Sequence, residues 1–227
     1  VYYDRANSAC ALLDPDALDL SALDTARFLH LTGITPALSA QSREICARLL
    51  ARARAKRIPL AFDVNYRARL CSPEQAAANI EEACQQAQIL LCTRADAAEL
   101  WNIKGEPEAI LRALAERFTA HGETKTLVLT LSESGSAHLV NGAYHIEPVR
   151  PTEGKVRFGS GDAFAAGYLY ATLHGPLFVE LEREQGITPL TFGNTFAALK
   201  RCIAGDIALI TPTDISTLFQ QGTQRFR

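Results

Sequence analysis

The stretch Gly159-Ser160-Gly161-Asp162-Ala163-Phe164 places a glycine-rich turn directly before an apolar helix, which we predict over residues 163–173. Two glycines allow the backbone to turn tightly and leave its amides uncovered by side chains. The first amides of a helix have no acceptor within the helix and carry partial positive charge, so such a turn suits a bound anion. The carboxylate of Asp162, in the first helical turn, is suited to accept a proton beside that anion.

The same stretch has a purely structural interpretation, because aspartate is common in the first turn of any helix. Two nucleotide motifs are excluded. No Gly-Lys-Ser/Thr follows the turn, as a P-loop would require. Phe164 stands where the third glycine of a dinucleotide-binding fingerprint would be. By itself the turn therefore leaves the structural and the anion-binding interpretations open.

Length and composition indicate one globular domain. The 227 residues are 48% hydrophobic and 21% charged, with a formal net charge of −2. This charge gives no electrostatic footprint for nucleic acid or for an anionic membrane. No apolar run reaches transmembrane length, and the first residues lack the pattern of a signal peptide. We therefore expect a cytoplasmic protein with neither nucleic acid nor membrane as a partner.

The cysteines indicate the redox state of the chain, and the lack of methionine bears on its N-terminus. None of the six cysteines forms a C-x-x-C pair, so free thiols are expected rather than structural zinc. They are Cys10, Cys46, Cys71, Cys84, Cys92 and Cys202. The sequence contains no methionine and begins at Val1, so we expect that an N-terminal part is missing.

Hydrophobic patterning predicts alternating strands and helices. Strands are predicted at residues 28–32, 58–62, 89–92 and 126–131, and a hairpin at 136–140 and 143–148 around Asn141-Gly142. Helices are predicted at residues 41–57, 72–87, from 93, and at 108–120, 163–173, 189–204 and 214–221. Residues 1–13 are predicted to be extended. This alternation indicates an α/β fold, with a mostly parallel sheet covered by helices on both faces.

Polar side chains follow the predicted strands at the points where ligands bind in such sheets. Asp63, Asn65 and Arg67 come after one strand, and Thr93 and Asp96 come after the next. Residues 132–135 follow the fourth strand, and the glycine turn leads into its helix in the same way. We expect these four clusters to face one edge of the sheet, which favours the anion-binding interpretation of Asp162.

Arg67 and Arg69 are interpreted differently. A guanidinium offers a fork of donors that fits a carboxylate or a phosphate, and we assign Arg67 a ligand role. Arg69 is expected to be a solvated loop residue. Asp63 and Asn65 would alternate along an extended segment and could orient a hydroxylated ligand.

The sequence resembles the ribokinase-like, or PfkB, family of carbohydrate kinases. Residues 159–164 resemble the family's signature G-A-G-D-[AS]-F. The resemblance implies a three-layer α/β sandwich in a single domain over residues 1–227. It implies that Gly159, Ser160 and Gly161 form the anion hole for the transferring phosphate. It also implies that Asp162 is the catalytic base and contacts the substrate hydroxyl.

Within the family, the chain is most similar to the 2-keto-3-deoxygluconate kinases. Residues 63–67 resemble their D-x-N-x-R segment, and Tyr3-Asp4-Arg5 resembles their Tyr-x-Arg. By this resemblance Tyr3, Arg5 and Arg67, with Asp63 and Asn65, would bind a sugar acid. Two arginines suit the carboxylate of such a substrate, whereas a neutral hexose would not need them.

The resemblance also implies a nucleotide site and a metal. Residues 130–135 resemble the nucleotide-binding T-x-G-x-x-G segment, and residues 192–199 with Gly205-Asp206 resemble the C-terminal nucleotide flank. The implied nucleotide-binding residues are Thr130, Ser132, Glu133, Gly135, Gly159, Gly161 and Asn194. ATP and Mg²⁺ are the implied cofactors, with Asp96 acting on the metal through water, and a monovalent cation is a further candidate.

Several positions depart from the family pattern. Val156 stands where the family usually has an aspartate, and Thr93 replaces the asparagine of an N-x-x-E motif that ends here at Asp96. Ser132 replaces a glycine, and Cys71 stands where sugar-acid kinases often have tryptophan. The N-terminal strands and the β-lid are expected to be absent. A homo-oligomer is expected for the longer protein.

These features predict a kinase that transfers the ATP γ-phosphate to a primary hydroxyl of a 2-keto-3-deoxy sugar acid. For 2-keto-3-deoxygluconate the product would be the 6-phosphate. Two alternatives remain open: a kinase of a neutral sugar such as fructose or ribose, and a non-catalytic sugar- or nucleotide-binding protein.

Overall fold

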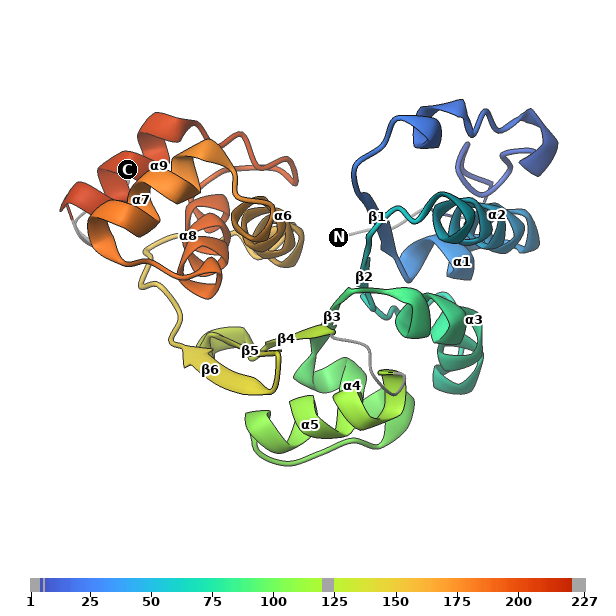
Figure 1. Cartoon of the computed structure of the whole chain (residues 1–227), viewed down its shortest axis with the longest axis horizontal. Helices are drawn as coiled ribbons and strands as arrows, with labels where there is room; N and C mark the ends of the chain where they lie inside the picture. The colour runs from blue at the N-terminus through green and yellow to red at the C-terminus, as the bar shows by residue number, and fades with distance from the viewer. Residues whose placement is uncertain (1–4, 6, 120–124, 222–227) are drawn as a thin grey trace. The chain divides into compact units, whose positions relative to one another are not determined.

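A computed structural model describes residue 5, residues 7–119 and residues 125–221. The chain divides into two compact units, each of which is described here by itself. The first unit comprises residues 1–130 and 138–144, and the second comprises residues 131–137 and 145–227. Figure 1 labels the helices and strands along the chain.

Six strands form one sheet, in the order β1-β2-β3-β4-β5-β6. They are β1 (Leu29–Thr32), β2 (Leu60–Asp63), β3 (Ile89–Thr93), β4 (Thr126–Thr130), β5 (Ser136–Val140) and β6 (Ala143–Glu147). Strands β1 to β4 pair in parallel with one another. A two-residue turn at Asn141 and Gly142 joins β5 to β6, and a connection this short requires an antiparallel pair. The predicted α/β class with a mostly parallel sheet is therefore confirmed.

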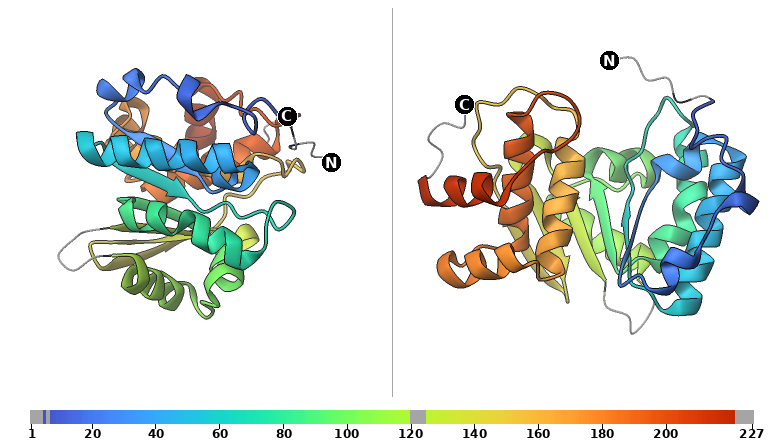
Figure 2. Two further views of the ribbon diagram at one scale, coloured as in Figure 1. Left: turned by 90° about the vertical axis from the view of Figure 1, so that its right-hand side faces the viewer. Right: turned by 90° about the horizontal axis from the view of Figure 1, so that it is seen from above.

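The helices of the first unit all lie on one face of its parallel strands (Figure 1). They are α1 (Ile34–Leu38), α2 (Ala40–Lys56), α3 (Pro73–Gln86), α4 (Arg94–Trp101) and α5 (Pro107–Phe118). Parallel strands in consecutive order with right-handed crossovers place every crossover helix on the same side. Each of these helices packs against the next along the chain, and Figure 2 shows them from two other directions.

Buried apolar strands explain why the centre of the first unit forms as predicted. Leu60, Ala61 and Phe62 of β2 are all at most 2% exposed, and the first four residues of β3 are buried as well. Near-continuous hydrophobic runs of this kind are typical of parallel strands with both faces covered. The helix after β2 begins where its sequence indicated, since Ser72 and Gln75 form a reciprocal capping box.

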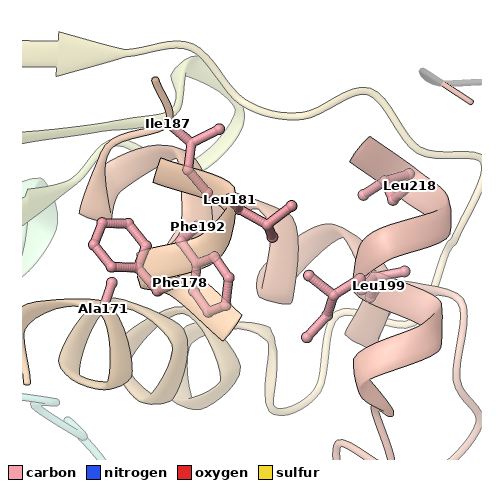
Figure 3. Packing of buried hydrophobic residues seen from close by; sticks show 8 residues of the cluster. Ala171, Phe178, Leu181, Ile187, Phe192, Leu199 and Leu218 are labelled. Carbon is pink, nitrogen blue, oxygen red and sulfur yellow. The ribbon is translucent and has the colours of Figure 1, made fainter. Parts of the chain in front are cut away.

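The second unit is mainly helical. Its helices are α6 (Ser160–Thr172), α7 (Pro176–Gln185), α8 (Pro189–Arg201) and α9 (Pro212–Gln221). Glycines allow α6 and α8 to approach closely, because a Cβ at Gly167 would lie 2.8 Å from the Phe196 ring and one at Gly193 would lie 2.9 Å from the Phe164 ring. The apolar cluster in Figure 3 joins α6, α7, α8 and α9 around Phe178, Leu181 and Phe192.

Two parts of the chain differ from the sequence-based prediction. Residues 7–12 form turns rather than an extended segment, because the Ser8 carbonyl accepts from the Leu12 amide at 3.0 Å and its hydroxyl accepts from the Ala11 amide at 3.2 Å. The short helix α1 and the helix α7 were not predicted. Helix α7 buries only Phe178 and Leu181, while its other large apolar residues, Leu177 and Val179, are half-buried and exposed, which gives a weak periodic signal.

Candidate active site

The ends of β1 to β4 align at one edge of the first unit's sheet. Thr32 pairs in register with Asp63, and Thr93 pairs with Thr130. Strand β3 connects the two pairs, since Asp63 lies in register with Leu91. Ligands bind at the carboxyl ends of parallel strands in α/β folds. The predicted convergence of the polar residues after β2 and β3 on one edge is therefore confirmed within this unit.

The loop after β2 carries the predicted substrate residues. The Val64 amide donates to the Leu91 carbonyl at 2.9 Å, which ties the start of the loop to β3. Asn65 then adopts a left-handed conformation with φ of 42°, which asparagine tolerates better than most residues. The Tyr66 hydroxyl donates to the Cys71 carbonyl at 3.1 Å and closes the loop. These contacts fix a loop whose next residue, Arg67, is exposed.

Arg67 is held near the loop backbone. Its Nη1 donates to the Tyr66 carbonyl at 3.0 Å, and its charge acts on the carboxylate of Asp96. The guanidinium still has several donors for a ligand, because arginine carries five N–H groups. Arg69 is exposed, as expected for a solvated loop residue.

Asp96 is a buried carboxylate at the start of α4. Its side chain is 7% exposed, and its amide donates to the Thr93 hydroxyl at 2.9 Å, so Thr93 caps the helix. Burial raises the pKa of Asp96, while hydrogen bonds from Thr93, the Arg67 charge and a backbone bond from Tyr66 act in the opposite direction. Asp96 Oδ2 has no hydrogen-bond partner among the residues that the structure describes. A buried carboxyl group with a raised pKa and an oxygen that lacks a hydrogen-bond partner is a candidate for a functional role.

The raised pKa of Asp96 predicts how stability depends on pH. The folded state binds this proton more tightly than the unfolded state, so the free energy of unfolding falls as pH rises from the unfolded pKa through the folded one. Asp96→Asn has no carboxylate to ionise. The difference in the free energy of unfolding between this variant and the parent should therefore shift in favour of the variant from pH 4 to pH 7. Urea unfolding of both proteins at the two pH values measures this difference. An unchanged difference would show that burial does not destabilise the charged form.

The glycine turn of the second unit has the predicted position before α6. Gly159 is the residue that precedes the helix, with φ of 69° and no side-chain cap. The Ala163 amide donates to the Gly159 carbonyl at 2.8 Å, and the Ser160 hydroxyl donates back to the Arg157 carbonyl at 2.8 Å. Asp162 lies in the first turn of α6 and is exposed. The side chain that would bear the proton is thus accessible at the helix N-terminus.

One side of this turn is packed and the other is open. A Cβ at Gly159 would lie 2.6 Å from the Asp206 carbonyl oxygen, whereas one at Gly161 would meet no atom within 4 Å among the described residues. The segment that leads to the turn also rests on the end of α8, because the Val156 amide donates to the Arg201 carbonyl at 3.1 Å. Val156 therefore contributes a backbone hydrogen bond that attaches this segment to the end of α8.

Residues 132–135 form a tight turn after β4. Ser132 has φ of 56° and Gly135 has φ of 105°, so the chain is left-handed at Ser132, where the family pattern has glycine. Glu133 forms an ion pair with Arg157 at 2.6 Å, and the two side chains are 75% and 74% exposed. An exposed pair of this kind contributes little to stability, so Glu133 remains available to a ligand.

Asn194 has a structural role in the second unit. It is 4% exposed and accepts a hydrogen bond from the Ser136 hydroxyl at 3.0 Å. Its amide donates to the carbonyls of Pro148 at 3.1 Å and Glu147 at 3.4 Å. Both amide hydrogens therefore have acceptors within the protein, and we leave Asn194 out of the nucleotide-binding set proposed below.

The remaining predicted positions are placed as follows. Tyr3 lies outside the described residues, and Arg5 is half-buried.

The six cysteines are free thiols, as expected. Burial raises the pKa of Cys46 to about 11 and raises that of Cys92 as well, which makes these two poor nucleophiles. Sequence reasoning missed Lys200 and Arg157, since a lysine or arginine in a polar stretch gives no signal of its contacts.

The described part of the chain contains no helix with the length and apolar character needed to cross a bilayer. Over the same residues there is no group of three or more histidine, cysteine, aspartate or glutamate side chains that could hold a metal ion.

Comparison with known proteins establishes the family. Residues 1–214 match the pfkB family of carbohydrate kinases, and the chain belongs to this family.

Three relatives illustrate the similarity. The 2-dehydro-3-deoxygalactonokinase of Haloferax volcanii is 32% identical over 222 residues, which cover 98% of this chain and 66% of that enzyme. The 2-dehydro-3-deoxygluconokinase structure from Thermotoga maritima is 25% identical with a TM-score of 0.81, covering 96% of this chain and 68% of the other. A ribokinase II from E. coli, solved with ATP and Mg²⁺, is 17% identical with a TM-score of 0.81 over 97% of this chain and 67% of the other.

These comparisons confirm the predicted ribokinase-like fold and the similarity to 2-keto-3-deoxy sugar acid kinases, since dehydro and keto name the same group. The E. coli structure supports the fold alone at its level of identity. The chain spans slightly under two thirds of the length of the Haloferax enzyme.

Proposed function

We propose that the protein transfers the γ-phosphate of ATP to a primary hydroxyl of a 2-keto-3-deoxy sugar acid. For 2-keto-3-deoxygluconate the product is the 6-phosphate. The observation that carries this proposal is the glycine turn at the start of α6, which is open at Gly161 and presents Asp162 in the first helical turn. The relatives that act on 2-dehydro-3-deoxy sugar acids support the choice of substrate class.

The proposed reaction uses the two properties of this turn. Asp162 accepts the proton of the sugar hydroxyl while the hydroxyl oxygen bonds to the γ-phosphorus. The bond from phosphorus to the ADP oxygen breaks. The backbone amides at Gly159, Ser160 and Gly161 stabilise the charge on the transferring phosphoryl oxygens. The Ser160 hydroxyl donates to the Arg157 carbonyl, so we assign that residue's contribution to its backbone.

The nucleotide would be held by the turn after β4, through Thr130, Ser132, Glu133 and Gly135, together with the glycine turn. When bound, Mg²⁺ would neutralise charge on the nucleotide phosphates. The buried, unpartnered Oδ2 of Asp96 fits a role in holding a water of the metal. A single carboxylate is sufficient, because Mg²⁺ commonly keeps several waters and binds mainly to phosphates. A requirement for a monovalent cation is a further part of the proposal that awaits measurement.

The carboxylate and hydroxyls of the sugar acid would be bound by Arg67, Asp63 and Asn65, with Arg5 and Tyr3. Support comes from the fixed loop after β2, which leaves Arg67 exposed next to the sheet edge. A planar guanidinium can bind a carboxylate through two parallel hydrogen bonds. Arg67 is therefore the residue that should distinguish acidic from neutral sugars.

Arg67→Ala tests this assignment. Charge-assisted hydrogen bonds contribute about 1.5–3 kcal/mol, so kcat/KM for 2-keto-3-deoxygluconate should fall about 10- to 150-fold. The value for a neutral hexose or for ribose should stay within about twofold. Steady-state ADP release with each sugar measures both, and Arg69→Ala is the matched control that should change neither.

Other outcomes would select a different substrate. Equal losses on acidic and neutral sugars would show that Arg67 does not recognise the carboxylate. A parent protein that prefers fructose or ribose would replace the sugar-acid assignment with the neutral-sugar alternative. Testing 2-keto-3-deoxygalactonate beside 2-keto-3-deoxygluconate would distinguish the two epimers within the proposed class.

A further inference from the structure

Lys200, in the last turn of α8, is fully buried, with none of its surface exposed. Its ammonium donates to the carbonyl of Ile203 at 3.2 Å and to that of Gly205 at 2.8 Å. A buried charge is destabilising unless polar groups surround it. The two carbonyls therefore form a cation site that is filled by a side chain of the protein itself, and they fix the loop after α8.

The end of the Lys200 side chain packs against the glycine turn. A Cβ placed on Gly159 would lie 3.3 Å from Lys200 Cε and 2.6 Å from the Asp206 carbonyl oxygen. Gly159 thus packs against the lysine stem and against the loop that the ammonium holds through Gly205. The backbone that enters the turn rests on the same helix end, through the bond from the Val156 amide to the Arg201 carbonyl.

A second buried lysine shows what a purely structural contact of this kind looks like. Lys125, which is 8% exposed, donates to the carbonyls of Cys84, Gln85 and Phe118 at 2.6, 2.9 and 2.7 Å. Cys84 and Gln85 lie in the last turn of α3, and Phe118 is the last residue of α5. Lys125 belongs to the first unit, whereas Lys200 and the glycine turn both belong to the second.

We propose that Lys200 is a positioning residue for phosphoryl transfer: its buried ammonium fixes the loop behind Gly159 and adds a positive charge to the anion site of the turn. This inference rests on the function proposed above. The charge is fixed in the protein interior, where it acts on an anion more strongly than a solvated lysine would. It reinforces the backbone amides without reorganising during the reaction.

The first test removes the charge and then returns it. Lys200→Met keeps most of the side-chain volume, and kcat should fall at least tenfold, while Lys125→Met should lower the unfolding temperature and leave kcat within about twofold. Lys200→Ala leaves space for a small cation. Ammonium chloride should restore its kcat several-fold, whereas tetramethylammonium chloride at equal ionic strength should not, because that ion is too large and donates no hydrogen bond.

Two results with the variants would overturn the proposal: a kcat within twofold of the parent in a folded Lys200→Met protein, or an absence of rescue specific to ammonium. If both Lys200 variants fail to fold, the parent protein gives the answer. The ¹⁵Nζ resonance of Lys200 should shift when pyrophosphate is added, and that of Lys125 should not. An unmoved Lys200 resonance also overturns the proposal. If the parent binds pyrophosphate but phosphorylates no sugar, the proposed function fails independently of Lys200.

Discussion

Asp162→Asn is expected to lower kcat by about 10²- to 10⁴-fold, the range that a general base contributes. The amide keeps the shape of the side chain but cannot accept the hydroxyl proton. Asp162 is exposed at the start of α6, and asparagine at a helix start is well tolerated. The unfolding temperature should therefore change little. Steady-state ADP release and thermal unfolding measured on the same preparation separate the two effects.

The next residue, Ala163, provides a control for this variant. Ala163 is buried in α6, so Ala163→Gly should lower stability through helix propensity by about 1 kcal/mol without removing the base. A large loss of kcat in Asp162→Asn with a KM for ATP near that of the parent would support the assigned role. Retention of more than about a tenth of the parent kcat would exclude Asp162 as the general base.

Gly135→Ala is expected to destabilise the protein by about 2–6 kcal/mol, since backbone strain and overpacking each contribute about 1–3 kcal/mol. Gly135 has φ of 105° and ψ of −136°, a conformation available essentially to glycine alone. A Cβ there would lie 2.1 Å from the Glu147 carbonyl oxygen and 2.7 Å from the Val149 amide nitrogen. Backbone atoms cannot move aside as a flexible side chain would. The turn after β4 should therefore lose its shape.

The neighbouring Ser132 provides the opposite change in the same turn. Its φ of 56° is left-handed, so Ser132→Gly should raise the free energy of unfolding by up to about 1 kcal/mol. Urea unfolding of the two variants measures both effects. Equal stability of Gly135→Ala and the parent would mean that the turn does not have the conformation described here.

Sequence reasoning was most successful where a local signal and burial agreed. Strands β2 and β3 were predicted because their apolar runs are continuous, and α3 was predicted because Ser72 and Pro73 mark its start. The turn before α6 was predicted for the same reason, since glycines and an aspartate have strong local preferences. These features depend on residues that are adjacent in the chain.

What was missed depends on contacts between distant residues. The side chain of Asn194, which the resemblance assigns to the nucleotide site, bonds to Ser136 and Pro148, which are 58 and 46 residues away. The buried ammonium of Lys200 has no sequence signature, because lysine is usually solvated. The burial of Asp96 was also not predicted. Periodicity cannot reveal such positions, since they are polar residues enclosed by tertiary structure.

The most direct test of the proposed function is sugar-dependent phosphoryl transfer, measured as ADP release together with the ³¹P spectrum of the product. With ATP, Mg²⁺ and 2-keto-3-deoxygluconate, we expect ADP release that depends on the sugar acid, a phosphomonoester at its primary carbon, and near-complete loss of both in Asp162→Asn. ADP release that is the same with and without the sugar acid, and the same in Asp162→Asn, would contradict the proposal.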